Sequence, residues 1–259
     1  VVLAEKNSRL GGALLCEERV PFKEKLMQYI ALQTRLIERH PKIKVLLNTE
    51  VTPELIKKIA PDIVLAALGA RPIKPDIPGI DRANVFSAEE IYAQPEKAGR
   101  RVVIIGGGLV WMELAVYLGM LGRECTILEM MPELNDGGNN LQGLALSLEF
   151  KKYGTKISPA TKVVEINEQG VIGEFTGAKP SENFRFGLPN YYPEAESGRK
   201  LFAADTVVYA VGQKPRWDEA DSLRGYTKEF YQLGDCVAPR NIWHATNTAH
   251  FVARDLGRY

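Results

Sequence analysis

One segment, residues 101–129, restricts the fold more than any other part of the sequence. Arg101–Ile105 is a short run rich in β-branched residues, which is typical of a strand buried on both faces of a sheet. Three glycines follow, then a helix-forming stretch over residues 109–121, and then a second apolar strand that ends at Glu129. A strand, a glycine turn, a helix and an acid-ending strand in this order form the fingerprint of a dinucleotide-binding βαβ unit. The sequence therefore predicts an α/β fold with a nucleotide site at this turn.

The residue types of the fingerprint suit different parts of a nucleotide. Glycines let the backbone approach a pyrophosphate, and the helix that follows offers free N–H groups and the positive end of its dipole. A carboxylate at Glu129 accepts a hydrogen bond from a ribose 2′-hydroxyl and repels a 2′-phosphate, which favours NAD(H) over NADP(H). The alternative is a glycine turn that serves only packing, with Glu129 as an exposed acid at a strand end.

The fingerprint departs from its usual pattern at Trp111. The third glycine normally lets the helix pack closely on the strand, and an indole stands in its place here. The indole must either push the helix outward or lie across the nucleotide groove, and the sequence leaves both outcomes open. Either outcome should weaken nucleotide binding.

An internal repeat predicts a second unit built on the same plan. Val2–Glu5 matches Thr126–Glu129, and Ala67–Pro72 matches Ala210–Pro215 with one slip at its start. Both members of the second match follow an apolar strand that opens with an aspartate, Asp62 or Asp205. The extra length of the second unit is expected to lie in a surface excursion over residues 173–199.

We expect the sequence to begin partway through the first copy of the repeat. Residues 1–5 have the composition of a buried strand, and if Glu5 matches Glu129, the glycine turn of the first unit belongs some 20 residues before Val1. We therefore expect two Rossmann-like dinucleotide-binding domains in three layers, the first lacking its N-terminal strand, glycine loop and helix. The expected domains are a discontinuous one at residues 1–95 and 216–259, and one inserted in it at residues 96–215.

The last part of the chain reads as a strand and a closing helix. Phe230–Cys236 runs from an apolar strand into a Gly-Asp pair, and residues 241–259 have helical composition. An aspartate at a strand end beside a helix N-terminus can hold a sugar-alcohol hydroxyl, while the helix dipole faces an electron-accepting ring. The alternative for Asp235, taken alone, is a role as a turn residue.

Together these segments resemble the flavin-dependent pyridine-nucleotide reductases that have two dinucleotide-binding domains. Within that group the chain looks most like the C-terminal FAD/NAD(P)-binding half of the NADH:flavin oxidoreductases related to Old Yellow Enzyme, the 2,4-dienoyl-CoA reductase type. The resemblance covers essentially the whole chain. The segments that carry it are Glu5 with Leu10–Gly12, Leu68–Pro72, Gly106–Val110, Val211–Gly212, Leu233–Cys236 and Pro239–Ile242.

The resemblance implies an FAD site in the first domain and an NAD(H) site in the second. The FAD-binding residues that it implies are Glu5, Lys6, Arg9, Gly11, Gly12, Leu68, Gly69, Arg71, Gly234 and Asp235. The NAD-binding residues that it implies are Gly106, Gly108, Leu109, Val110, Glu113, Glu129 and Gly212. Full-length members of that family carry an FMN-binding barrel and an iron–sulphur cluster ahead of these domains, so FMN and the cluster are expected only in a domain outside this sequence.

The implied function is passage of a hydride from NADH to FAD, and on to a partner redox centre or an enoate-type substrate domain that the chain does not contain. The cofactors carry this chemistry, so no side chain is expected as a catalytic acid or base. A fragment of this kind is expected to be inactive alone in overall substrate reduction. The alternative from another class is a non-catalytic adenine-nucleotide-binding structural domain whose NAD site is obstructed by Trp111.

Composition narrows the partners. Lys and Arg number 33 against 32 Asp and Glu, which gives no electrostatic reason to expect a nucleic acid or an anionic membrane. Three scattered cysteines without a CxxC pair fit a reducing cytoplasm and argue against disulfide exchange and a four-thiolate cluster. The three histidines do not have the spacing of a metal site. Small-molecule nucleotides, an upstream barrel in a full-length protein and a homo-oligomer are the partners that remain open.

Overall fold

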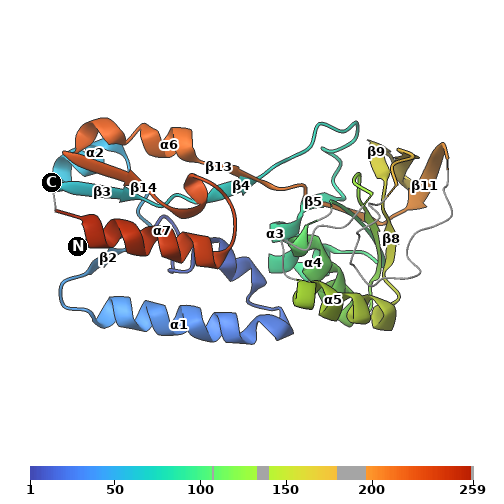
Figure 1. The fold of residues 1–259 in the computed structure, drawn as a ribbon, viewed down its shortest axis with the longest axis horizontal. Helices are drawn as coiled ribbons and strands as arrows, with labels where there is room; N and C mark the ends of the chain where they lie inside the picture. Colours follow the sequence, from blue (N-terminus) through green and yellow to red (C-terminus); the bar gives the residue numbers. More distant parts are fainter. Residues whose placement is uncertain (107, 133–139, 180–196, 258–259) are drawn as a thin grey trace. The chain divides into compact units, whose positions relative to one another are not determined.

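The computed structural model, drawn in Figure 1, describes residues 1–106, 108–132, 140–179 and 197–257. It divides the chain into two compact units. Unit 1 comprises residues 1–18, 22–71 and 213–259, and unit 2 comprises residues 19–21 and 72–212. Both contain parallel strands and helices, so the predicted α/β class with a Rossmann-like sheet is confirmed.

Unit 2 is built on a five-stranded sheet in which each neighbouring pair of strands is parallel. The strand order is β5 (Val85–Ser87), β12 (Thr206–Tyr209), β6 (Arg101–Ile105), β7 (Glu124–Leu128) and β8 (Lys156–Ser158). The β-branched residues of β6 are at most 6% exposed, which is why this strand takes the central position. The glycine turn after β6 therefore lies at the carboxyl edge of the sheet, where open α/β sheets bind ligands.

Two further layers cover the faces of this sheet. On one face α4 contacts β6 and β7 and packs between α3 and α5; these helices are α3 (Ala88–Ala93), α4 (Leu109–Met120) and α5 (Asn140–Tyr153). On the other face lies an antiparallel sheet of β11 (Arg199–Ala203), β10 (Gly170–Phe175) and β9 (Thr161–Ile166). Val103, Ile105 and Val207 of the parallel sheet form one apolar cluster with Val163 and Val171 of this second sheet. Unit 2 therefore has three layers, as predicted.

Unit 1 contains two separate pairs of parallel strands. The pairs are β1 (Val2–Ala4) with β2 (Lys44–Leu46), and β14 (Glu229–Gln232) with β3 (Ile63–Ala66). Its helices are α1 (Glu24–Arg39), α2 (Pro53–Ile59), α6 (Trp217–Asp221) and α7 (Ile242–Asp255), with 3-10 turns at Gly12–Glu17, Pro21–Lys23, Arg224–Tyr226 and Gly234–Cys236. The sequence predicted a buried first strand. Residues 2–4 do form a strand, but it is not buried, since Val2 is 43% exposed.

The division between the units differs from the expected domain boundary. Strand β4 (Ala70–Pro72) pairs with β13 (Gln213–Pro215), and the chain passes between the units at these two strands. Residues 72–95 belong to unit 2, because β5 joins its sheet beside β12, whereas the sequence interpretation placed them in the first domain. Most of the expected excursion at 173–199 lies outside the described residues.

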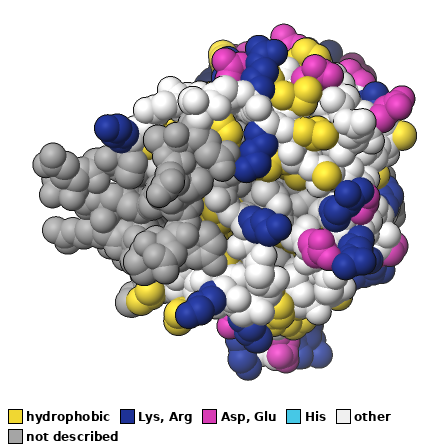
Figure 2. Space-filling view, turned by 90° about the vertical axis from the view of Figure 1, so that its right-hand side faces the viewer, with side chains coloured by type: hydrophobic (Ala, Val, Ile, Leu, Met, Phe, Trp, Pro, Cys, Tyr) yellow, Lys and Arg dark blue, Asp and Glu magenta, His cyan; other side chains and the backbone are white. Residues whose placement is uncertain are grey.

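The surface carries charges of both signs. Figure 2 shows Lys and Arg side chains spaced singly over one face of the molecule, among Asp and Glu side chains and scattered hydrophobic ones. In the described part of the chain, no helix has the length and apolar character needed to cross a membrane.

Candidate functional site

The two acids that the repeat pairs occupy the same local backbone structure. Glu5 follows the last residue of β1, and Glu129 follows the last residue of β7. Oε1 of each accepts a hydrogen bond from the backbone N–H two residues further on, from Asn7 at 2.8 Å and from Met131 at 2.6 Å. Both carboxylates are therefore fixed at the carboxyl edge of a parallel strand.

The match extends to the next strand of each sheet. The amide of each acid donates to the last residue of that strand, and its carbonyl accepts from Thr49 or Thr161, at distances of 2.8–3.1 Å. The residue before each threonine has a positive φ, 51° at Asn48 and 49° at Ala160. The correspondence of Glu5 with Glu129, predicted from sequence, is thus confirmed in the backbone.

The two acids differ in burial. Glu129 is 8% exposed, and burial raises the pKa of its carboxyl group, an effect opposed by the N–H groups of Met131 and Met130. Glu5 is only half-buried. A ligand hydroxyl that donates to Glu129 would stabilise its charged form, which is the chemistry expected of a ribose site.

Gly106 closes the central strand of unit 2 in a conformation that requires glycine. Its φ is 131°, and its amide donates to the carbonyl of Leu128 at 3.0 Å. A Cβ at this position would lie 2.4 Å from the carbonyl oxygen of Ala210, after the neighbouring strand β12. Gly106 therefore brings the ends of β12, β6 and β7 together at one edge, and Glu129 and Gly212 follow at that edge.

Gly108 borders open space at the start of α4. It is the N-cap residue, its backbone is extended, and a Cβ built on it would meet nothing within 4 Å. The first turn of α4 presents Leu109 and Val110, of which Val110 is 46% exposed and accepts a hydrogen bond at its carbonyl from the Tyr92 hydroxyl at 2.9 Å. This combination of open space and a helix N-terminus suits the approach of a pyrophosphate.

Trp111 is packed in the core of unit 2. Its side chain is 0% exposed and stacks on Phe150 of α5, with ring centroids 6.3 Å apart and an interplanar angle of 17°. Its Nε1 has no hydrogen-bond partner in the described structure. The indole thus does not lie across an open groove, which was one of the two outcomes expected from sequence.

Glu113 is turned toward α5. It is 4% exposed, and its Oε1 accepts a hydrogen bond from Nε2 of Gln142 at 2.6 Å. Its predicted contact with NAD and those of the other unit 2 residues stay predictions, although the structure places Gly106, Gly108, Glu129 and Gly212 at one edge of one sheet.

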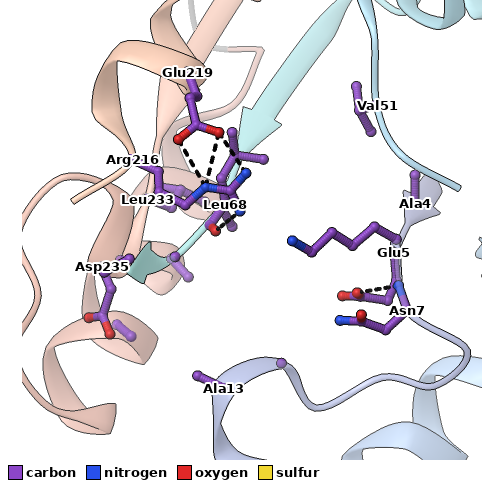
Figure 3. Close-up of a pocket in the computed structure, with 18 of the residues that line it drawn as sticks. Ala4, Glu5, Asn7, Ala13, Val51, Leu68, Arg216, Glu219, Leu233 and Asp235 are labelled. Atoms are coloured by element: carbon purple, nitrogen blue, oxygen red, sulfur yellow. Dashed lines mark hydrogen bonds and ion pairs between the residues drawn. The ribbon is translucent and has the colours of Figure 1, made fainter. Parts of the chain in front are cut away.

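Unit 1 contains a cavity of about 1120 Å³, large enough for a nucleotide-sized ligand (Figure 3). Glu5 and Asn7 lie on one side of it, and Leu68, Arg216 and Asp235 lie on the opposite side. Of the residues predicted to bind FAD, those that line this cavity are Glu5, Lys6, Gly12, Leu68, Gly69, Gly234 and Asp235. An extended ligand in this cavity would have Glu5 at one end and Asp235 at the other.

The remaining residues predicted to bind FAD make other contacts. Arg9 forms an ion pair with Glu18 at 2.7 Å, and Arg71 forms one with Glu219 at 2.9 Å. Gly11 packs tightly, because a Cβ there would lie 2.6 Å from Cδ2 of Leu15. The structure does not place these three among the cavity-lining residues that it describes.

Sequence reasoning missed Arg216, which shapes the wall of the cavity. Its side chain is 13% exposed; Nη1 donates to the carbonyl of Leu68 at 3.0 Å, and its backbone N–H donates to the carbonyl of Gly69 at 3.3 Å. Nε and Nη2 donate to Glu219, and these hydrogen bonds hold the pKa of the Glu219 carboxyl below its ordinary value. Arg216 thereby ties the loop after β3 to α6, a contact between distant segments that no local motif signals.

Asp235 lies between β14 and α7. Gly234 has a φ of 62°, and Oδ1 of Asp235 accepts the backbone N–H of Arg240 at 3.3 Å. Arg240 and the N-cap residue of α7, Asn241, line the cavity beside it. The described residues contain no group of three or more His, Cys, Asp and Glu side chains placed to hold a metal ion.

Comparisons with known proteins place these features in context. The model of the pyridine nucleotide-disulphide oxidoreductase family matches residues 24–249. Bilirubin reductase of Mediterraneibacter gnavus is 30% identical over 237 residues, which are 91% of this chain and 34% of that protein. Cinnamate reductase of Clostridium sporogenes is 27% identical over 261 residues, 99% of this chain and 36% of that protein.

A solved structure extends the similarity to the fold. The complex of 2-naphthoyl-CoA reductase with 2-naphthoyl-CoA has a TM-score of 0.83 and 27% identity, covering 96% of this chain and 35% of that one. The chain thus spans about a third of the length of these relatives.

Proposed function

The chain belongs to the pyridine nucleotide-disulphide oxidoreductase family, and from this premise we propose that it is the dinucleotide-binding part of a longer flavoenzyme, with NADH in unit 2 and FAD in unit 1. One observation carries the proposal. Each unit holds an acid in the same hydrogen-bonded setting at the carboxyl edge of parallel strands, at Glu5 and at Glu129. Two such acids suit two adenosine riboses, and so two dinucleotides.

The residues of the chain bind and orient in this proposal. FAD supplies the ring that accepts the hydride of NADH. Glu5 and Glu129 accept hydrogen bonds from ribose hydroxyls, the open space at Gly108 admits a diphosphate, and Asp235 takes a hydroxyl of the ribityl chain. Hydride transfer depends on the stacking of two rings, so the chain needs no acid–base dyad for it.

The sheet of unit 1 supports a further element between β1 and β3. In unit 2 the central strand β6 lies between β12 and β7. In unit 1, β3 corresponds to β12 and β1 corresponds to β7, but in the described part of this unit the two strands belong to separate pairs. Leu65 of β3 is 42% exposed, and neither α1 nor α7 has a buried residue, whereas α4 is almost wholly buried between its neighbours. We propose that a strand, a glycine loop and a helix of the longer protein complete unit 1 here and supply the main cradle of the FAD diphosphate.

The electron acceptor is proposed to lie outside the chain. Cinnamate and 2-naphthoyl-CoA, named for two relatives, are conjugated carbonyl compounds, which supports an enoate-type acceptor. An upstream FMN barrel with an iron–sulphur cluster, of the kind found beside Old Yellow Enzyme-related reductases, would relay the electrons. A cytoplasmic location and a homo-oligomer stay predictions.

Disulfide exchange has no support in the cysteines. Cys16, Cys125 and Cys236 form no disulfide in the described structure, and Cys125 and Cys236 are buried. Burial raises the pKa of the Cys125 thiol to about 12, which suppresses the reactive thiolate. The non-catalytic alternative depended on Trp111 obstructing the NAD site, and the burial of the indole supports the redox proposal over it.

The test is anaerobic reduction of the longer protein by NADH. We expect bound flavin that loses its visible absorbance on addition of NADH. Glu129→Gln should raise the NADH concentration needed, while Glu5→Gln should lower the flavin content. Bound flavin that NADH does not reduce would favour a structural nucleotide-binding domain instead.

A further inference from the structure

Arg240 is a cationic residue of the unit 1 cavity for which the fingerprint motifs assign no role. We propose that Arg240 binds the diphosphate of FAD, and that His244 and Asn241 hold its guanidinium for this purpose. The inference rests on the proposed FAD site in unit 1. It adds to that site a cationic, diphosphate-binding element that lies on α7 and the turn before it.

A relay of two hydrogen bonds fixes the guanidinium. Oδ1 of Asn241 accepts the backbone N–H of His244 at 3.1 Å, which identifies it as the acceptor oxygen of the amide. The same oxygen lies 2.9 Å from Nδ1 of His244, so Nδ1 carries the hydrogen. Nε2 is then the acceptor, and it lies 3.3 Å from Nη1 of Arg240. The relay therefore connects Arg240 to Asn241 through the imidazole of His244.

The guanidinium of Arg240 has no carboxylate bonded to it within the described part of the chain. Its side-chain contact is with His244, and Asp235 accepts only its backbone N–H. Arg216, by contrast, is neutralised by Glu219 and also bonded to a carbonyl. The other cation among the cavity-lining residues that the structure describes is Lys6, which follows Glu5 in the chain, and Glu5 lies on the side opposite Asp235. Arg240 is therefore the cation available on the Asp235 side.

The chemistry of FAD selects the diphosphate as the partner. Oxidised FAD has one anionic group, the diphosphate, which joins directly to the ribityl chain proposed to meet Asp235. A guanidinium presents a planar fork of donors that matches phosphate oxygens, and charge-assisted bonds of this kind are about twice as strong as neutral ones. An arginine held without a carboxylate partner suits this task better than one engaged in an ion pair.

The test is a fluorescence titration of oxidised FAD, with riboflavin as the phosphate-free probe. Arg240→Gln should weaken FAD binding about tenfold or more and leave riboflavin binding unchanged. His244→Phe should weaken FAD binding by a smaller factor, and His244→Gln should restore it, because an amide oxygen can accept from Arg240. Arg254→Gln, in the last turn of the same helix, is the control for loss of one charge. Rising KCl should weaken FAD binding less in Arg240→Gln than in the wild type.

The outcomes separate this inference from the proposed function. If the wild-type chain and the longer protein do not bind FAD at all, the FAD site itself is wrong. If the wild type binds and Arg240→Gln binds oxidised FAD equally well, the FAD site stands and the role of Arg240 is refuted. A variant that binds oxidised FAD normally but has a lower flavin midpoint potential would place Arg240 at the reduced ring, which also overturns the diphosphate assignment.

Discussion

Replacing Glu129 by glutamine should stabilise the fold while it weakens NADH binding. The side chain is 8% exposed, and Oε1 accepts the N–H of Met131 at 2.6 Å. Glutamine has the same size and can keep this hydrogen bond through its own oxygen, so the change removes the charge with little change in packing. The two effects have opposite signs, which a general loss of structure could not produce.

The sign of the stability effect follows from the pKa. Burial raises the pKa of the folded Glu129 carboxyl above its ordinary value of 4.5. A raised pKa contributes stability below the unfolded value, and this contribution is lost as the pH rises through the folded value. At about pH 8 the wild type therefore carries an unfavourable buried charge, and Glu129→Gln should have the higher urea midpoint. The difference should shrink as the pH falls toward 4.5.

The size of the binding effect follows from the hydrogen bond that loses its charge. A hydrogen bond to a charged group contributes about 1.5–3 kcal/mol, and a neutral one roughly half as much. Glu129→Gln should thus cost about 1 kcal/mol, roughly a fivefold higher Kd for NADH in calorimetry. Glu5→Gln, in the same backbone setting but half-buried, is the matched control and should leave NADH binding unchanged. A lower urea midpoint at about pH 8 together with an unaltered Kd would refute the reasoning.

Two further predictions use other parts of unit 2, and a third compares a cysteine of each unit. Gly106→Ala should lower the urea midpoint, because its Cβ would lie 2.4 Å from a carbonyl oxygen. Gly108→Ala should fold normally and lose NADH affinity, since its Cβ enters only open space. A Gly106→Ala variant as stable as the wild type would contradict this prediction. Trp111→Gly should lower the free energy of unfolding in urea by about 3–5 kcal/mol, because it empties a buried site. Trp111→Phe, which removes the unpartnered Nε1, should lower it far less. Tighter NADH binding by Trp111→Gly would restore the hypothesis that the indole obstructs the NAD site. A thiol reagent at neutral pH should react with half-buried Cys16 before Cys125, whose pKa of about 12 keeps its thiol protonated. Equal reaction rates of the two cysteines in the native protein would count against the burial of Cys125.

The sequence predicted the parts of the fold that depend on short segments. Arg101–Ile105 became the central strand because a β-branched run of this length fits a position buried on both faces. The structural correspondence of Glu5 with Glu129 was also confirmed, because a strand end, an acid and the N–H group two residues further on form a local structure. Local sequence is sufficient for features of this kind.

Features that depend on distant segments were missed or misplaced. Residues 72–95 fall in unit 2 because the three-residue strand Val85–Ser87 pairs with β12, far along the chain. The expectation for Trp111 was that the indole must push the helix outward or lie across the groove, whereas it is buried and stacks on Phe150 of α5. Arg216 donates to the carbonyl of Leu68, which is distant in the chain, and neither segment contains a motif that would predict this contact.

The unequal burial of the two acids depends on what surrounds the motif. Glu129 stands beside the central strand of a complete sheet and is nearly inaccessible, whereas Glu5 follows a strand whose residues are exposed or half-buried. A strand placed beside β1 would flank Glu5 as β6 flanks Glu129, and it would remove the Glu5 carboxylate further from water, which costs free energy unless the carboxylate is hydrogen-bonded. FAD hydroxyls that donate to Glu5 would offset this cost, so completion of unit 1 and flavin binding would be coupled at this carboxylate.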